Sequence, residues 1–192
     1  MGPQTAPEAS TASRPTSTAS SPRSFPPTPC SWDPAASATE SERFTSQARG
    51  EMTYFNVCLL MFRPQSLFDK LLRPAVENGA ITTIQFVLDE GERENWARHV
   101  APKVAACAGA AKVQEPRWCA LHESVSFILA DTGEEGRPEA LLSFWSEPFM
   151  SRATEMQVPR YIFRVQRHSE LIARLAELER QYRVGASPPA DG

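Results

Sequence analysis

Two almost continuously apolar runs, separated by a short polar loop, are the feature that most constrains this fold. The runs are VSFILA and EALLSFW, within residues 124–150, and the loop between them holds Gly133 and Gly136 and ends at Pro138. Apolar runs of this length around Gly and Pro predict two strands joined by a turn. Because the runs do not alternate with polar residues, we expect other elements to cover both faces of the hairpin.

The segment before this hairpin predicts a strand, a helix and a second strand. Residues 52–62 and 81–88 are rich in strand-forming residues, and apolar residues at helical spacing lie between them, over residues 67–76. Two strands connected in this way are expected to be parallel, with a right-handed crossover. The later elements that we expect are a helix over about 92–111, a strand over 158–165 and a helix beginning after Ser169. The chain therefore predicts an α/β fold, with a mixed sheet of about five strands and helices packed on it.

The two ends of the chain differ in composition from the middle. Residues 1–45 are rich in Ser, Thr, Pro and Ala without apolar periodicity, and residues 185–192 contain Pro and Gly. Such segments bury too little apolar surface to offset the entropy of ordering them, so we expect both to be disordered. One α/β domain is predicted over residues 46–184, in which residues 113–123 link the second helix to the hairpin.

The charge and the cysteines set the expected partners and location. A formal net charge of −3 gives no electrostatic reason to expect nucleic acid or an anionic membrane as a partner. No apolar run is long enough for a membrane span, and the chain opens with no secretory pattern. The cysteines lack CxxC spacing, which favours reduced thiols and a cytoplasmic location. We therefore expect no nucleic-acid partner, no membrane binding and no cofactor.

Polar residues around the hairpin are the best candidates for a binding site, since strand ends in α/β layers open onto crevices. The candidates are His122, Glu123, Ser124, Ser126, Asp131, Trp145 and Ser146. The same pattern also arises without a site, if His122 and Glu123 are ordinary surface residues and Trp145 belongs to the core.

Catalytic and metal-binding patterns are incomplete in this sequence. Cys119 and His122 have CxxH spacing, but no second Cys or His pair supplies the other ligands of a structural zinc site. Cys119 or Cys58 with His99, His122 or His168 would supply a nucleophile and a base, yet no third orienting group is identifiable. We therefore assign no catalytic residue and no metal ligand.

The element order, together with SVSFILAD, EALLSFWSEPF and NGAITTIQFVLDE, resembles a single repeat of the phospholipase D superfamily over roughly residues 52–183. One strand of that family carries the motif HxKxxxxD. Placing Asp131 at the family's Asp puts Ser124 at the His position and Ser126 at the Lys position. Using His122 as the family's His puts serine and leucine at the Lys and Asp positions. The resemblance implies a scaffold without the family's catalytic His and Lys.

These observations predict a non-enzymatic interaction or regulatory module, a pseudoenzyme that acts through its groove on an unknown protein partner or as a homodimer. The homodimer is implied by the resemblance, because members of the family commonly bring two repeats together in one site. The alternative is a hydrolase or transferase with an unrecognised site near His122, Glu123, Asp131 and Ser146, and a binder of lipid surfaces is a further option. Whether the chain is an enzyme stays open, with the non-enzymatic interpretation favoured.

Overall fold

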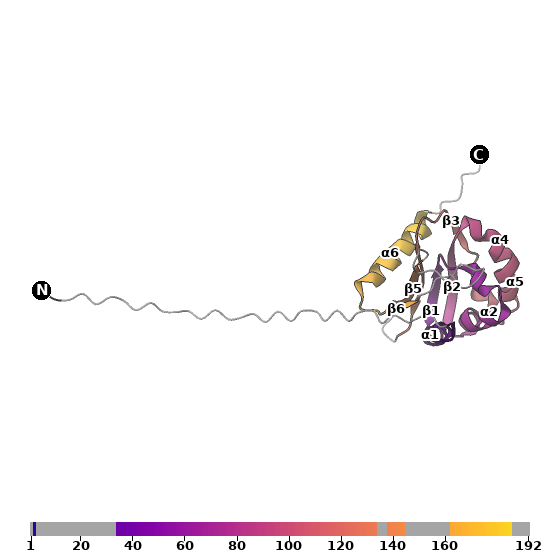
Figure 1. Cartoon of the computed structure of the whole chain (residues 1–192), viewed down its shortest axis with the longest axis horizontal. Helices are drawn as coiled ribbons and strands as arrows, with labels where there is room; N and C mark the ends of the chain where they lie inside the picture. The colour runs from indigo at the N-terminus through magenta and orange to yellow at the C-terminus, as the bar shows by residue number, and fades with distance from the viewer. Residues whose placement is uncertain (1, 3–33, 134–137, 145–161, 186–192) are drawn as a thin grey trace, which may run out of the picture.

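The computed structural model describes residue 2 and residues 34–133, 138–144 and 162–185, and a mixed sheet between helices forms its centre (Figure 1). The sheet has the order β3-β2-β1-β4-β5-β6. Its strands are β1 (Arg49–Phe55), β2 (Ile81–Asp89), β3 (Arg117–Cys119), β4 (Val125–Asp131), β5 (Pro138–Phe144) and β6 (Phe163–Val165). Strands β1, β2 and β3 are parallel, whereas β4, β5 and β6 pair in antiparallel fashion from the other side of β1. The predicted α/β class is confirmed, with six strands among the described residues in place of about five.

Helical segments cover both faces of this sheet. They are α1 (Pro34–Gln47), η1 (Leu59–Phe62), α2 (Gln65–Leu71), α3 (Arg73–Glu77), η2 (Glu90–Glu92), α4 (Arg93–Asn95), η3 (Trp96–Val100), α5 (Ala101–Ala105), η4 (Ala110–Lys112) and α6 (Glu170–Gly185). Helix α6 lies on one face, and the helices of the first half of the domain lie on the other (Figure 1). Among the described helices, none has the length and apolar character that crossing a bilayer requires.

Strand alternation divides the apolar side chains between two cores. On β1, Tyr54 stacks on Phe86 with ring centroids 4.7 Å apart, in the core beneath α1 to α5. The next residue, Phe55, stacks on Phe127 at 4.6 Å, in the core beneath α6. The hairpin is buried as predicted, since Phe127 is 1% exposed and its pairing partner Leu142 is 5% exposed. Both faces of the sheet are therefore dry at its centre.

The boundary of the domain differs from the prediction. Helix α1 begins at Pro34, inside the segment 1–45 that we expected to be disordered. Phe44 and Ala48 pack into the core at 0% and 1% exposure. The apolar burial that stabilises this helix comes from a few residues near its end, which the polar composition of the whole segment conceals.

Three elements of the second half also differ in detail from the prediction. The segment 113–123, expected to be a linker, contributes the edge strand β3, which pairs with β2 over three residues. The expected helix over 92–111 is divided into the short segments α4, η3, α5 and η4. Strand β6 begins at Phe163, and residues 158–161 of the predicted strand lie outside the described residues.

Candidate ligand-binding cavity

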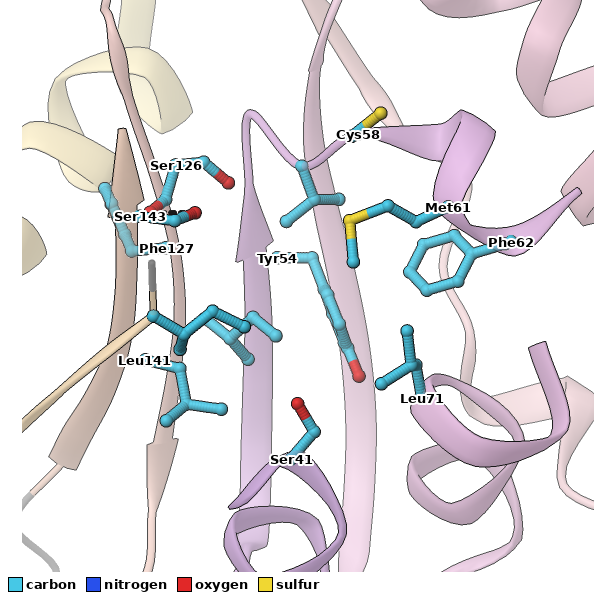
Figure 2. A pocket seen from close by; sticks show the side chains of 13 residues that line it. Ser41, Tyr54, Cys58, Met61, Phe62, Leu71, Ser126, Phe127, Leu141 and Ser143 are labelled. Carbon is cyan, nitrogen blue, oxygen red and sulfur yellow. Dashed lines mark hydrogen bonds between the residues drawn. The ribbon is translucent and has the colours of Figure 1, made fainter. Parts of the chain in front are cut away.

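A partly enclosed cavity of about 60 Å³ lies on the α1 to α5 side of the sheet (Figure 2). It is lined by Ser41, Tyr54, Val57, Cys58, Met61, Phe62, Leu71, Ser126, Phe127, Ile128, Leu141, Ser143 and Ile162. Helices α1 and α2, the turn η1 and strands β1, β4 and β5 all contribute to this wall. Most of the lining side chains are apolar, and none of these described residues is an acid, a lysine, an arginine or a histidine.

The cavity exists because two small side chains face each other across a strand pair. Ser126 of β4 and Ser143 of β5 are direct neighbours in register, and Ser143 Oγ donates a hydrogen bond to the backbone oxygen of Ser126 at 3.5 Å. Along β4, Ser126 and Ile128 face the cavity side, whereas Leu129 packs in the core beneath α6. Serine at two paired positions leaves space that the larger residues at neighbouring positions would fill.

Tyr54 places a buried polar atom in this apolar wall. Its side chain is 1% exposed, and its hydroxyl is buried without a hydrogen-bond partner within the described part of the chain. In Figure 2 the phenol extends from β1 toward the end of the cavity where Ser41 and Leu71 lie. Burial raises the pKa of Tyr54, so the hydroxyl stays protonated and is able to donate or accept a hydrogen bond.

The thiol of Cys58 is the other titratable group in the wall. Burial raises the pKa of Cys58 to about 11, although hydrogen bonds from the backbone at Met61 and Leu60 lower it in part. A thiol with such a pKa is protonated at neutral pH, and the thiolate is the nucleophilic form of cysteine. The lining residues supply no base that would activate Cys58 or the serines. The chemistry of this wall therefore suits contact with a neutral molecule rather than with an ion.

The residues predicted for a site are only partly brought together. Ser126 lines the cavity. His122, Glu123 and Ser124 precede β4, whereas Asp131 ends it and accepts a hydrogen bond from the Gly133 amide at 3.0 Å. His122 thus precedes one end of β4 and Asp131 forms the other, and the strand between them is roughly 20 Å long.

This separation bears on the alternative of a hydrolase or transferase. That alternative places His122, Glu123 and Asp131 in one site, and the two ends of β4 hold them apart. Trp145 and Ser146, also predicted for the site, lie outside the described residues.

Sequence reasoning missed two residues that define the cavity, Tyr54 and Ser143. Tyr54 stands in MTYFNVCLLMF and Ser143 in EALLSFW, and both runs were interpreted only as buried strands. The available signal was a hydroxyl-bearing side chain inside an otherwise apolar strand, because a buried hydroxyl requires a partner.

Comparison with known proteins finds distant likeness among solved structures. No family model matches the chain, and no curated protein matches it. Among solved structures, the chain is similar to TrmBL2, an archaeal chromatin protein whose structure is described as showing a novel mode of DNA binding. The two share 13% sequence identity with a TM-score of 0.47, over 82% of this chain and 48% of that one. This chain thus spans about half the length of that neighbour.

The neighbour contradicts two expectations from the sequence. It is a DNA-binding chromatin protein, whereas we expected a module that acts on a protein partner and expected no nucleic-acid partner. Both expectations are withdrawn. The second rested on net charge, which is a property of the whole chain and does not describe any local surface. At this identity and TM-score the likeness to TrmBL2 supports no statement about what this chain binds. The resemblance to the phospholipase D superfamily is not tested by these comparisons and stays a prediction.

Proposed function

We propose that this domain binds a small, neutral and mostly apolar molecule that carries one hydrogen-bonding group, in the cavity between η1, α1 and the sheet. The observation that carries this proposal is the buried hydroxyl of Tyr54, which has no partner within the described part of the chain. A buried hydroxyl without a hydrogen bond lowers the stability of a fold by about 1–3 kcal/mol. An oxygen or nitrogen atom of a ligand would remove this cost.

The uncharged wall supports a neutral ligand. The lining contains serine, tyrosine, cysteine and apolar residues only. Moving an ion out of water into such a wall would be very unfavourable, because no opposite charge compensates for the lost hydration. Carboxylates, phosphates and ammonium groups are therefore poor ligands for this cavity.

The volume limits the part of the ligand that is enclosed. A cavity of about 10–15 Å³ holds one water molecule, and a dry apolar cavity of about 150 Å³ binds benzene. The volume of about 60 Å³ therefore suits a polar head group with a short alkyl segment rather than a whole aromatic ring. Because the cavity is only partly enclosed, the rest of a longer molecule would extend out through its open side.

Titration with butan-1-ol, followed by two-dimensional NMR of the full chain, tests this proposal. We expect saturable shifts of the amide signals of Tyr54, Ser126 and Leu141, with a dissociation constant in roughly the millimolar range for so small a ligand. In the variant Ser126→Ile, the larger side chain occupies the cavity, and these shifts should disappear.

Ser124→Ile is the matched control for this blocking variant, since it introduces the same side chain two residues earlier, at an exposed position outside the cavity wall. It should bind butan-1-ol as the wild type does. Shifts that do not saturate, or equal binding by the Ser126→Ile variant, would contradict the proposal.

A further inference from the structure

A second cavity, of about 440 Å³, lies beside the carboxyl ends of the parallel strands β2 and β3. It is lined by Glu90, Trp118, Cys119, Ala120, Glu123, Gln181 and Tyr182. Trp118 and Cys119 end β3, and the other lining residues follow the carboxyl ends of β2 and β3 or belong to the last turns of α6, which ends near β3 (Figure 1). Ligands of open α/β sheets bind outside the carboxyl ends of parallel strands, and the volume is in the range of small-molecule sites.

The carboxylate of Asp89, which is not part of the wall, holds the two segments that follow β2 and β3. Asp89, the last residue of β2, accepts a hydrogen bond from the Gly91 amide at 2.9 Å through Oδ1. Its Oδ2 accepts a second bond from the Leu121 amide at 3.0 Å. Asp89 therefore holds the loop that carries Glu90 against the segment that carries Glu123. The backbone that carries the two glutamates is thus held in place.

Asn56, which directly follows β1, holds the segment around Glu123 in place. Asn56 has a φ of 50°, in the left-handed region that asparagine adopts more readily than most residues. Its side-chain amide donates to the backbone oxygens of Glu123 at 2.9 Å and of Val125 at 3.0 Å. Residues 123–125 are thus tied to β1 at the point where the parallel and antiparallel parts of the sheet meet.

The carboxylates of Glu90 and Glu123 give the described lining of this cavity its negative charge. Glu123 Oε1 accepts a hydrogen bond from the Tyr182 hydroxyl at 3.2 Å, which orients the carboxylate. Neither Glu90 nor Glu123 forms an ion pair with any residue that the structure describes, and the lining contains no lysine or arginine. Burial raises the pKa of the Cys119 thiol, which stays neutral beside them.

Two arginines near this cavity are already engaged. The guanidinium of Arg93 lies over the Trp118 ring, 4.8 Å from its centroid. Arg117 donates a hydrogen bond to the backbone oxygen of Arg183 at the end of α6. Arg93 thus covers one face of the indole, and aromatic faces stabilise alkylated ammonium groups in particular.

We infer that this second cavity binds a small alkylated ammonium compound, held between the carboxylates of Glu90 and Glu123 and against the rings of Trp118 and Tyr182. A metal ion is a poorer fit, since no three His, Cys, Asp or Glu side chains of the described residues are grouped to hold one. The inference is independent of the Tyr54 cavity, because the two sites share no lining residue.

Calorimetric titration of the full chain with choline tests this inference, with 3,3-dimethylbutan-1-ol as the neutral compound of the same shape. We expect choline to bind and the neutral compound to bind at least about tenfold more weakly, because only choline carries the charge that the carboxylates attract. Glu90→Gln and Glu123→Gln should each raise the dissociation constant of choline by about tenfold. In Glu123→Gln the side-chain oxygen is still able to accept the hydrogen bond from the Tyr182 hydroxyl. This variant therefore removes the charge and keeps the size and the hydrogen bond of the side chain.

Glu42→Gln is the matched control, since it removes the same charge from an exposed position on α1 outside this cavity. It should leave the dissociation constant of choline unchanged. Equal binding of the two compounds, no effect of both cavity variants, or no binding of choline at millimolar concentration would each overturn the inference. The Ser126→Ile variant, which blocks the other cavity, should bind choline normally.

Discussion

Tyr54 differs from phenylalanine by a single oxygen atom, which forms no hydrogen bond with the described residues. Its ring stacks on Phe86, and its hydroxyl has no partner in the described part of the chain. Phenylalanine at this position would keep the stacking and avoid the buried polar atom. A tyrosine here is consistent with a hydroxyl that acts on a ligand rather than on stability.

The variant Tyr54→Phe should therefore be more stable than the wild type when no ligand is present. We expect the free energy of unfolding to rise by about 1 kcal/mol, because the cost of an unsatisfied hydroxyl disappears. Urea denaturation of both proteins measures this change.

Tyr182→Phe is the control for this measurement, since the same atom is removed from a tyrosine whose hydroxyl does have a partner. Tyr182 donates to Glu123 at 3.2 Å, and losing this bond should lower the free energy of unfolding by about 1 kcal/mol. The two substitutions are thus expected to change stability in opposite directions. A destabilised Tyr54→Phe variant would mean that the hydroxyl has a structural partner.

Between elements, a charged network joins α1, β5 and β6 on the side of the first cavity. Arg164 of β6 donates to the carboxylate of Glu139 on β5 at 2.7 Å and to Glu40 of α1 at 3.0 Å. Glu139 is 6% exposed. Burial alone would raise the pKa of Glu139, but hydrogen bonds and charge from Arg164, with a further bond from Arg167, lower it. This network holds α1 at the end of the sheet.

Removing the charge of Glu139 should destabilise the domain in a way that depends on pH. At neutral pH, Glu139→Gln should lower the free energy of unfolding by about 2 kcal/mol, because Arg164 loses its buried anionic partner. The pKa of Glu139 is lower in the folded than in the unfolded state. Its contribution is therefore fully present above the unfolded value of about 4.3, and it is lost as the pH falls through the folded value.

Urea denaturation of wild type and variant between neutral and strongly acidic pH measures this dependence. The difference between the two proteins should shrink as the solution becomes acidic. Glu94→Gln, which removes the partner of Arg98 from an exposed helical pair, should change stability by less than about 0.5 kcal/mol at any pH. A difference for Glu139→Gln that does not depend on pH would contradict the assignment.

Elements with long local sequence patterns were predictable, whereas elements that depend on pairing or packing with distant segments were not. The hairpin around Phe127 and Leu142 and the parallel pair β1 and β2 are encoded by apolar runs and turn residues in their own segments. Strand β3 has three residues and pairs only at an edge, so its own sequence carries little information. Helix α1 depends on the packing of Phe44 rather than on helical periodicity.

Across the whole molecule, the two cavities differ in charge and in position. The first is neutral and lies on the face beneath α1 to α5, and the second is acidic and lies at the carboxyl edge of the parallel strands. Asn56 stands between them, since the residues after it line the first cavity and its side chain holds Glu123 of the second. One sheet thus offers separate sites for a neutral and for a cationic ligand.

Neither cavity as a whole was predictable from the sequence, for a physical reason. Ser126 and Glu123 were recognised as candidates, each as one polar residue near the hairpin. The space around Ser126 results from its register with Ser143, and the second cavity requires α6 to end beside β3. Register and helix docking are properties of the folded chain that no local pattern specifies.

The most direct test of the Tyr54 cavity compares butan-1-ol with 1-chlorobutane, which has a similar shape but a much weaker hydrogen-bonding group. NMR titration gives the dissociation constants of both compounds for the wild type and for Tyr54→Phe. We predict that the substitution weakens butan-1-ol binding relative to 1-chlorobutane binding by about fivefold, the effect of one lost hydrogen bond. An unchanged ratio of the two constants would contradict the role of the Tyr54 hydroxyl in binding a ligand.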